Sequence, residues 1–283
     1  MNIEHIAVIG AGTMGRGIAQ VCAGSGYQVT LIDVIPEQLE HAMASVRKSV
    51  EKLHSKGRLT DEQREAALAN VTTADEVAAA ADADLVIEAV VESLAVKKRV
   101  FAELDDCTRP QVILASNTSS ISITELGAVT HRPEQVIGMH FMNPVPLMTL
   151  VEVIRGLATS DETTATVVAL TDTLGKTPVE AQDYPGFISN RILCPMINEA
   201  IYALMEGVGT REAIDTVMKL GMNHPMGPLT LLDFVGLDTL LFIADAMYEE
   251  YKDPRFAAPP LLRQMVLAGH LGRKSGKGFY DYS

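Results

Sequence analysis

The chain has 283 residues, of which 47% are hydrophobic and 21% are charged, and its formal net charge at pH 7 is −13. This length suggests about two domains, and the composition is that of a folded globular protein, which argues against a disordered chain. The acidic balance, with a pI of about 5.0, argues against nucleic acid or an anionic membrane surface as the main partner.

The cysteines and the hydropathy pattern predict a cytoplasmic protein. Cys22, Cys107 and Cys194 are widely separated, which favours reduced thiols and matches no metal-ligand spacing, so we expect no metal. A strand begins at once at residue 5, which leaves no room for a signal or transit peptide. The most apolar later run, residues 229–247, is interrupted by three aspartates. We therefore expect a buried helix there and no membrane span.

A strand, a glycine-rich loop and a helix open the chain. Residues 5–9 have the pattern of a strand, residues 10–15 (GAGTMG) fit GxGxxG, and residues 28–33 (QVTLID) have the pattern of the next strand. Such glycines allow a tight turn and a close approach of the backbone to a pyrophosphate at a helix N-terminus. Asp33 ends the second strand, where a carboxylate can bind the adenosine ribose hydroxyls. Because Asp33 would repel a 2′-phosphate and no arginine follows it, the pattern predicts NAD in preference to NADP.

A helical hairpin is expected after the second strand. Residues 36–57 have the pattern of a long helix, and residues 60–63 (TDEQ) form a capping box for a second one. The first helix concentrates positive charge within an acidic protein, at Arg47, Lys48, Lys52, Lys56 and Arg58. The three lysines among them are spaced four residues apart and share a face, with Ser45 and Ser49 beside them. Such a face is often merely solvated, but it also suits an anionic substrate tail, such as the phosphates of coenzyme A.

Strand and helix patterns alternate through the remainder of the first half. Strands are expected at residues 71–73, 85–90, 112–116, 136–142, 147–154 and 177–181, with helices at residues 75–81, 94–106, 122–128 and 160–174. This alternation predicts an α/β fold with a doubly wound, mostly parallel sheet of the Rossmann type. Because ligands bind at the carboxyl ends of such strands, the polar residues there are site candidates: Glu92, Lys97, Asn117, Thr118, Ser119, Ser120, His140 and Asn143.

Two apolar runs, residues 136–142 and 147–154, flank the sequence Asn-Pro-Val-Pro at residues 143–146. The prolines exclude a continuous helix and predict an extended or turning connection. Each run carries one ionisable group, His140 in the first and Glu152 in the second. If the runs are neighbouring strands, the carboxylate can meet the imidazole, orient the ring and raise its basicity. The alternative is two unconnected residues, because a single histidine in a strand is usually structural.

The pattern changes at residues 183–186 (DYPG). Beyond them, helical spacing of apolar residues recurs at residues 187–204, 211–220, 229–251 and 260–267. We therefore place a NAD-binding domain at residues 1–184 and an all-helical substrate and dimerisation domain at residues 185–283. These helices carry more apolar surface than so small a domain buries easily, which predicts a homodimer. Asn190 and Arg191 lie in the first turn of the opening helix, where they either face the cleft or cap the helix.

Several separate stretches, in the same order along the chain, resemble the L-3-hydroxyacyl-CoA dehydrogenase family, and most closely its short bacterial 3-hydroxybutyryl-CoA dehydrogenases. The stretches are VIGAGTMGRGIA (8–19), ASNTSS (115–120), HFMNPVP (140–146) with LVEVI (150–154) after it, DYPGFISNR (183–191), NHPMGP (223–228) and GRKSGKGFYDY (272–282). Together they span essentially the whole chain. The resemblance implies NAD-dependent hydride transfer between (S)-3-hydroxybutyryl-CoA and acetoacetyl-CoA.

The resemblance also implies roles for individual residues. His140 matches the catalytic base and Glu152 its partner, while Ser119 and Asn190 match positions that contact the 3-oxygen of the substrate. The matching NAD positions are Gly10, Ala11, Gly12, Thr13, Met14, Gly15, Asp33, Glu92, Lys97, Asn117, Ser119, Asn143 and Lys274. Ser49 and Lys56 match positions that hold coenzyme A, and Lys52 shares their helix face.

Two other functions stay open on the sequence. One is a dehydrogenase of a hydroxy acid without coenzyme A on the same framework, for which the basic helix face would have no use. The other is a non-catalytic NAD-binding protein, which would not need to keep His140, Glu152, Ser119 and Asn190 together.

Overall fold

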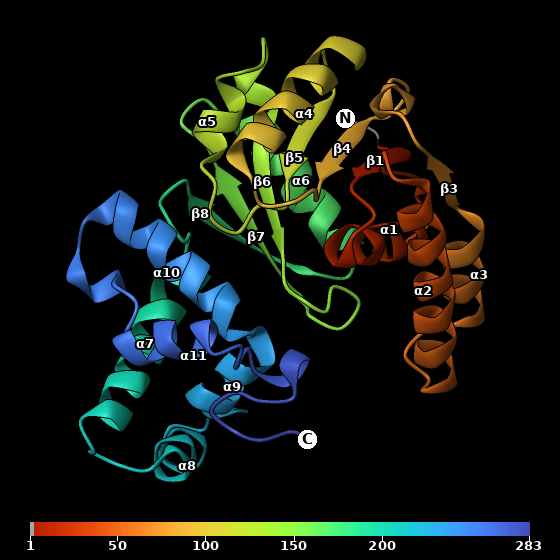
Figure 1. Ribbon diagram of the computed structural model, residues 1–283. Coiled ribbons are helices and arrows are strands. Elements are labelled where there is room, and N and C mark those ends of the chain that lie inside the picture. The colour runs from red at the N-terminus through yellow and green to blue at the C-terminus, as the bar shows by residue number, and fades with distance from the viewer. Residues whose placement is uncertain (1–2) are drawn as a thin grey trace. The chain divides into compact units, whose positions relative to one another are not determined.

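The computed structural model describes residues 3–283, and the chain forms two compact units, one ending at Tyr184 and the other beginning at Pro185. The first unit is built on an eight-stranded sheet, and the second unit is helical (Figure 1). Each unit has its own apolar core.

The sheet of the first unit has the strand order β3-β2-β1-β4-β5-β6-β7-β8. Its strands are β1 (His5–Ile9), β2 (Gln28–Ile32), β3 (Val71–Ala74), β4 (Leu85–Glu88), β5 (Ile113–Ser116), β6 (Val136–Phe141), β7 (Leu150–Arg155) and β8 (Thr177–Gln182). All neighbours are parallel except β6 and β7, which are antiparallel. The strand order reverses between β1 and β4, which is where a doubly wound sheet opens a crevice for a ligand.

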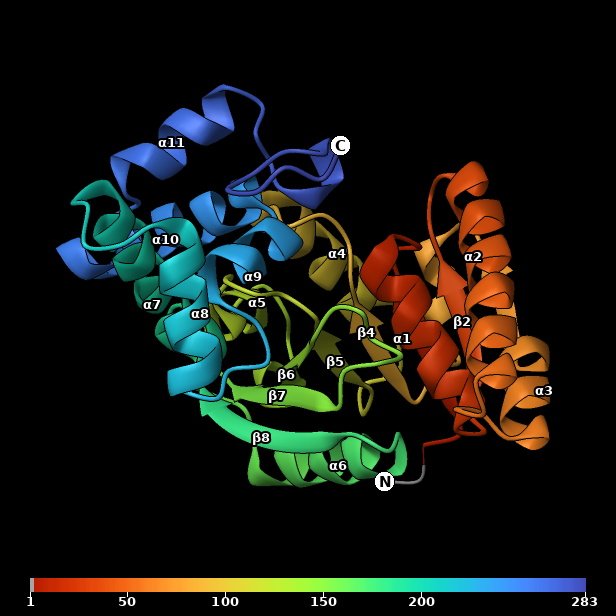
Figure 2. The ribbon, with the colours of Figure 1, turned by 90° about the horizontal axis from the view of Figure 1, so that it is seen from below.

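Helices lie on both faces of this sheet (Figures 1 and 2). They are α1 (Thr13–Gly24), α2 (Pro36–Ser55), α3 (Asp61–Ala69), α4 (Leu94–Cys107), α5 (Ile123–Gly127) and α6 (Asp161–Thr173), with short 3₁₀ helices η1 (Val77–Ala80) and η2 (Pro133–Gln135). Strand residues such as Val8, Met139 and Val153 form one core with α1 and α6. Helices α4 and α5 lie on the opposite face, and α2 and α3 form the hairpin after β2. The predicted fold class is confirmed.

The local sequence patterns predicted the kind of each element better than they predicted its first and last residues. The capping box of α3 is complete, because Thr60 accepts a hydrogen bond from the Gln63 amide and Gln63 accepts one from the Thr60 amide. At the start of α5, Ser122 and Glu125 form only half of a capping box: the Ser122 hydroxyl accepts a hydrogen bond from the Glu125 amide, but the Glu125 carboxylate pairs with Lys98. The strand expected from residue 147 begins at Leu150, because residues 144–148 form a turn.

The second unit contains α7 (Ser189–Met205), α8 (Arg211–Gly221), α9 (Pro228–Val235), α10 (Leu237–Tyr251), η3 (Pro254–Phe256), α11 (Pro260–Leu267) and η4 (Arg273–Ser275). The all-helical prediction is confirmed. The prediction of a single helix over residues 229–251 is wrong, because the helix is interrupted at Gly236, between α9 and α10. That residue has φ +107°, a conformation that side chains disfavour and glycine accepts.

Two buried aspartates of the second unit explain much of the C-terminal motif. Asp233 accepts hydrogen bonds from the Phe279 and Tyr280 amides, each 2.8 Å long, and from the Tyr282 hydroxyl. Asp215 accepts the amides of the first turn of α9 and the Tyr280 hydroxyl. Because buried carboxylates are costly without such partners, these contacts fix the tail against α8 and α9.

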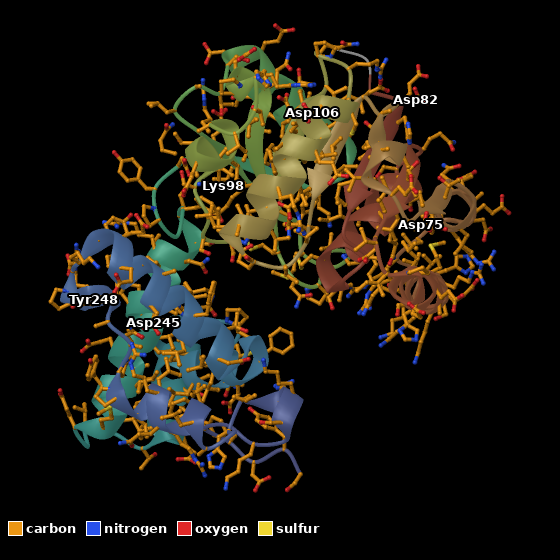
Figure 3. All side chains as sticks on the ribbon, turned by 45° about the horizontal axis from the view of Figure 1, so that its top comes forward. Asp75, Asp82, Lys98, Asp106, Asp245 and Tyr248 are labelled. Carbon is orange, nitrogen blue, oxygen red and sulfur yellow. The ribbon has the colours of Figure 1, made fainter. Side chains whose placement is uncertain are left out.

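Much of the negative charge lies on the surface of the molecule. Asp75, Asp82 and Asp106 are exposed carboxylates of the first unit, and Asp245 of the second pairs with Arg263 (Figure 3). Within residues 3–283, no helix combines the length and the hydrophobicity that crossing a membrane requires.

Candidate active site

The loop between β1 and α1 has the shape that a dinucleotide pyrophosphate requires. Gly10 has φ +101°, and a Cβ at Gly15 would lie 1.8 Å from the Gly10 carbonyl oxygen, so both positions need glycine. A Cβ at Gly12 would meet nothing within 4 Å, so the loop is open on that side. No side chain caps α1 and no acidic residue occupies its first turn, where Thr13 and Met14 lie. Its N-terminal dipole is therefore suited to a phosphate.

Asp33, just after β2, is tied to this loop. One carboxylate oxygen accepts the Ala11 amide at 2.8 Å and the other accepts the Ile35 amide at 3.0 Å. The acid therefore lies beside the glycine loop at the carboxyl end of β2, as binding of a ribose requires. The side chains of Val34 and Ile35 next to it are exposed and apolar, which suits the flat face of a base. These residues fit NAD.

His140 and Glu152 lie on the same face of the antiparallel pair β6–β7. The register places the two residues directly opposite each other, and His140 Nδ1 and Glu152 Oε2 are 2.8 Å apart. Both side chains are buried, at 8% and 1% exposure for the residues. The predicted contact is present. Since Nδ1 is bonded to the carboxylate, Nε2 is the ring nitrogen suited to exchanging a proton.

A buried ion network lies at the carboxyl ends of β4 and β5. Lys97, at 1% exposure, donates to Glu88 Oε1 at 2.7 Å and lies 3.2 Å from Glu92 Oε2. Ser116 donates to the other oxygen of Glu88 at 2.6 Å. Glu88 and Lys97 are buried and Glu92 is half-buried, and the pairing of the ammonium with both carboxylates offsets the cost of burying the groups.

The loop that follows β5 is organised by Glu92. Its Oε1 accepts the Thr118 hydroxyl at 2.6 Å and the Ser119 amide at 2.9 Å, and the Ser119 hydroxyl lies 3.3 Å away. Burial raises the pKa of Glu92, but the Lys97 charge and these hydrogen bonds outweigh it and hold that pKa below its usual value. Asn117 joins the loop to β6, because its side-chain oxygen accepts a hydrogen bond of 2.9 Å from the Phe141 amide.

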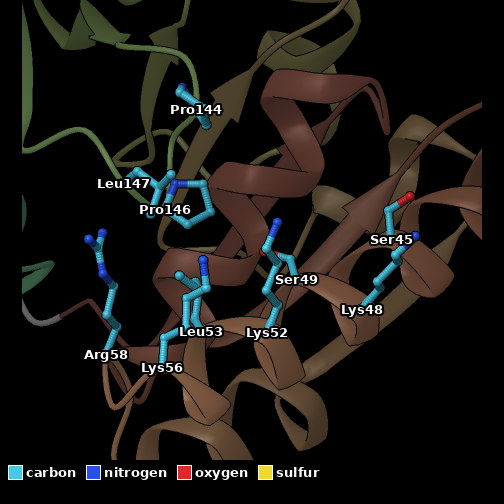
Figure 4. A pocket seen from close by; sticks show the side chains of 10 residues that line it. All are labelled: Ser45, Lys48, Ser49, Lys52, Leu53, Lys56, Arg58, Pro144, Pro146 and Leu147. Atoms are coloured by element: carbon cyan, nitrogen blue, oxygen red, sulfur yellow. The ribbon is translucent and has the colours of Figure 1, made fainter.

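A basic pocket lies between α2 and the connection from β6 to β7 (Figure 4). It has a volume of about 450 Å³. Its lining residues are Ser45, Lys48, Ser49, Lys52, Leu53, Lys56, Arg58, Pro144, Pro146 and Leu147. Four of these are cationic and none is acidic, so the pocket attracts an anion. The expectation that the three lysines share a face is confirmed, although Lys56 lies just beyond the last residue of α2.

Three of the candidate residues named on the sequence, Asn190, Arg191 and Lys274, belong to the second unit. Asn190 is buried in the first turn of α7, and the N-cap position is taken by Ile188, so the capping interpretation is wrong. The Arg191 guanidinium stacks on the Tyr251 ring, 4.4 Å from its centroid. Lys274 donates to Asp238 at 2.6 Å.

Sequence reasoning missed part of the buried network. Glu88 and Ser116 were not selected, although an acid inside the apolar run LVIEAV (85–90) is itself a signal of a buried partner. Lys176 was also missed, and it contacts the wall of the basic pocket.

Comparison with known proteins identifies the family. Residues 5–184 match the family model of the 3-hydroxyacyl-CoA dehydrogenase NAD binding domain, and residues 186–282 match that of its C-terminal domain. A probable 3-hydroxybutyryl-CoA dehydrogenase of Bacillus subtilis is 54% identical, covering 100% of this chain and 98% of the relative. A protein of the same name from Deinococcus radiodurans is 56% identical, with 97% and 99% covered. The solved (S)-3-hydroxybutyryl-CoA dehydrogenase of Ralstonia eutropha superimposes with a TM-score of 0.95, at 48% identity and with both chains fully covered.

The doubly wound sheet, with its glycine loop and Asp33, defines an NAD-binding protein. The chain belongs to the 3-hydroxyacyl-CoA dehydrogenase family. The predictions of the family, the fold class and the cofactor are thus confirmed.

Proposed function

We propose that this chain interconverts (S)-3-hydroxybutyryl-CoA and acetoacetyl-CoA with NAD(H), using His140 and Glu152 for proton transfer. The observation that carries the proposal is the 2.8 Å contact between these two buried side chains. The names of the relatives and the cationic lining of the pocket beside α2 support this choice of substrate.

Bound NAD supplies the acceptor for the hydride that leaves C3 of the hydroxyacyl group. In that direction His140 Nε2 removes the proton of the 3-hydroxyl, and in the reverse direction it returns it. Glu152 stabilises the imidazolium and fixes the ring, because its charge acts across a short, buried hydrogen bond. General-base assistance of this kind contributes about 10²–10⁴ in rate.

Ser119 and Asn190 would donate hydrogen bonds to the 3-oxygen as charge develops on it. Loss of one such donor costs roughly 2.7–4 kcal/mol of transition-state stabilisation. The Ser119 backbone is bonded to Glu92, which in turn pairs with Lys97. The network therefore orients the serine before the substrate binds, and pre-organisation of donors is what makes them effective.

The glycine loop and Asp33 would hold the pyrophosphate and the ribose of the cofactor. Glu92, Asn117 and Asn143 follow strand ends of the same sheet and would line the rest of its site, together with Lys274. Lys97 lies in α4 at 1% exposure, so its predicted role would be exerted through Glu92, with which it pairs. Hydride transfer needs no metal ion, and within residues 3–283 no cluster of three His, Cys, Asp or Glu side chains has the arrangement of a metal site.

The phosphates of coenzyme A would bind in the basic pocket, at Ser49, Lys52 and Lys56. A hydroxy acid without coenzyme A has no group that would need four clustered cations. This separates the proposal from a dehydrogenase of free hydroxy acids. A non-catalytic NAD-binding role is disfavoured because the imidazole–carboxylate pair is intact and buried, which is costly to keep without a use.

We further propose that the protein is a homodimer formed through the second unit. Helix α8 buries only Asp215, while Val217 and Leu220 are exposed at 58% and 81%. An apolar groove of about 450 Å³ lies between α7 and α8. A second copy is the natural occupant, because the same groove on both partners gives a closed, isologous contact. Sedimentation of Leu220→Asp should give a monomer, while Leu157→Asp, at a leucine of the first unit that is also highly exposed, should sediment as the wild type does.

The deciding experiment follows the loss of NADH absorbance after acetoacetyl-CoA is added to the wild-type protein. Steady turnover with acetoacetyl-CoA and little with free acetoacetate supports the proposal. Turnover with free acetoacetate at equal efficiency favours the hydroxy-acid alternative. No NADH loss with either compound, in a sample that binds NADH, favours the non-catalytic alternative.

A further inference from the structure

The connection between β6 and β7, residues 142–149, forms one wall of the basic pocket. Its residues Pro144, Pro146 and Leu147 face the basic side chains of α2 (Figure 4). The same connection starts two residues after His140, so its course affects both the pocket and the end of the strand that carries the imidazole. What fixes this wall therefore affects the binding of whatever the pocket holds.

Lys176, the residue before β8, holds this wall in place through its side chain. Its ammonium donates to the Val145 carbonyl at 2.6 Å and to the Met148 carbonyl at 2.7 Å. The lysine is itself anchored, because it follows the turn at Gly175 and precedes Thr177, whose amide donates to the Thr149 carbonyl at 2.6 Å. Burial lowers the pKa of Lys176. The two carbonyl oxygens compensate for part of the desolvation of its charge.

The wall has a second anchor on α1. Val145 is 2% exposed, and a Cβ at Gly17 would lie 2.9 Å from the Val145 Cβ, so this side chain packs directly on the helix of the glycine loop. By contrast, Leu147 and Met148 are 47% and 43% exposed, so packing holds them weakly. Their amides both donate to the Pro144 carbonyl. Beside these backbone hydrogen bonds, the outer half of the wall is restrained by the hydrogen bond from the Lys176 side chain to the Met148 carbonyl.

We propose that Lys176 is a positioning residue that sets the width of the basic pocket by fixing the connection at residues 142–149. The inference rests on the proposed function, in which this pocket binds the phosphates of coenzyme A. Lys176 does not itself line the pocket. It acts on the ligand through Pro146 and Leu147, which keep the opposite wall at the right distance from Lys52 and Lys56.

The test compares Lys176→Met, which removes the donors and keeps an unbranched side chain, with Lys176→Arg, which keeps the charge and the donors. Lys98→Met is the control, since Lys98 pairs with Glu125 outside the pocket. Two readouts are measured. The first is amide hydrogen exchange at Leu147 and Met148, with β1 amides as an internal reference for the intact fold. The second is KM for acetoacetyl-CoA and for acetoacetyl-N-acetylcysteamine, which lacks the nucleotide and the pantothenate.

In Lys176→Met we expect exchange at Leu147 and Met148 to accelerate about tenfold while the β1 amides stay protected. KM for acetoacetyl-CoA should rise about tenfold, which corresponds to about 1.4 kcal/mol. KM for the truncated thioester should change less than about twofold, because that compound does not reach the pocket. Lys176→Arg should restore both readouts.

Unchanged exchange in Lys176→Met overturns the proposal, and so does an equal rise in KM for both thioesters. Absence of wild-type turnover with acetoacetyl-CoA refutes the proposed function instead. In that case the exchange measurement still decides whether Lys176 fixes the connection.

Discussion

His140 and Glu152 occupy directly opposed positions on β6 and β7, with 2.8 Å between Nδ1 and Oε2, and they are only twelve positions apart in the chain. The antiparallel direction of β7 makes this possible, because a short connection can join antiparallel strands but not parallel ones. The one reversal in an otherwise parallel sheet therefore brings the carboxylate to the imidazole. Burial of both groups strengthens their electrostatic coupling.

Replacement of His140 by glutamine should abolish most of the activity. Loss of the proton acceptor is expected to lower kcat by about 10²–10⁴, while Kd for NADH changes less than about twofold, since the glycine loop and Asp33 are untouched. His41→Gln, an exposed histidine on α2, is the matched control and should behave as wild type. A His140→Gln variant that retains a tenth or more of the wild-type kcat would contradict the proposed role.

His140 and Glu152 should act as one unit. Glu152→Gln alone is expected to lower kcat strongly, because the imidazolium loses its counter-charge. In the His140→Gln background the same change should cost less than about threefold, since residues that share one function are not additive. Steady-state kinetics of the four proteins completes the cycle. If the two effects simply multiply, Glu152 acts on something other than His140.

Charge reversal at Lys56 should weaken binding of coenzyme A thioesters. The phosphates would meet a carboxylate in place of an ammonium, so KM for acetoacetyl-CoA is expected to rise roughly tenfold or more. Acetoacetyl-N-acetylcysteamine should be unaffected, because it carries no phosphate. Arg47→Glu makes the same charge change within α2, at a residue outside the pocket lining. An equal rise in KM for Arg47→Glu would mean that the overall charge of the protein, and not the pocket, determines the binding of the thioester.

Features that depend on local pattern were predictable from the sequence. The glycine loop, the strand that ends at Asp33 and the alternation of strands and helices each leave a signature within a few residues. The residue pattern predicted the pairing of His140 with Glu152 only on the condition that the two apolar runs are neighbouring strands, and the family resemblance then supported it. The basic face of α2 followed from the helical period alone.

Features that depend on tertiary contacts were not predictable in this way. Glu88 lies in an apolar run, and only the neighbouring strand and α4 reveal that Ser116 and Lys97 satisfy it. Lys176 is 31 positions from Val145 and 28 from Met148, whose carbonyls it binds. No repeat in the sequence connects these positions. The break at Gly236 was hidden because apolar spacing continues across it, and a single backbone angle leaves no mark on that spacing.

Glu92 should contribute to stability in a pH-dependent way. Burial raises its pKa, but Lys97 and the hydrogen bonds from Thr118 and Ser119 hold it below the ordinary value of 4.5. A carboxyl whose pKa is lower in the folded chain stabilises the fold above its unfolded pKa, and this stabilisation disappears as the pH falls through the folded value. Glu92→Gln should therefore be less stable than wild type near neutral pH, by an amount that shrinks below about pH 4.5. Urea unfolding at several pH values measures this, and a difference independent of pH would contradict it.

Alanine at Gly12 and at Gly15 should separate cofactor binding from folding. At Gly15 the new Cβ would lie 1.8 Å from the Gly10 carbonyl oxygen, so the loop or α1 must shift, at a cost of about 1–3 kcal/mol in stability. At Gly12, φ is −64° and the Cβ meets nothing within 4 Å, so thermal unfolding without cofactor should stay close to wild type. Kd for NADH should nevertheless rise about tenfold in Gly12→Ala, because the methyl group would occupy the side on which a pyrophosphate approaches the backbone. NADH fluorescence titration and thermal unfolding of both variants check this. Wild-type affinity in Gly12→Ala would mean that the pyrophosphate lies elsewhere.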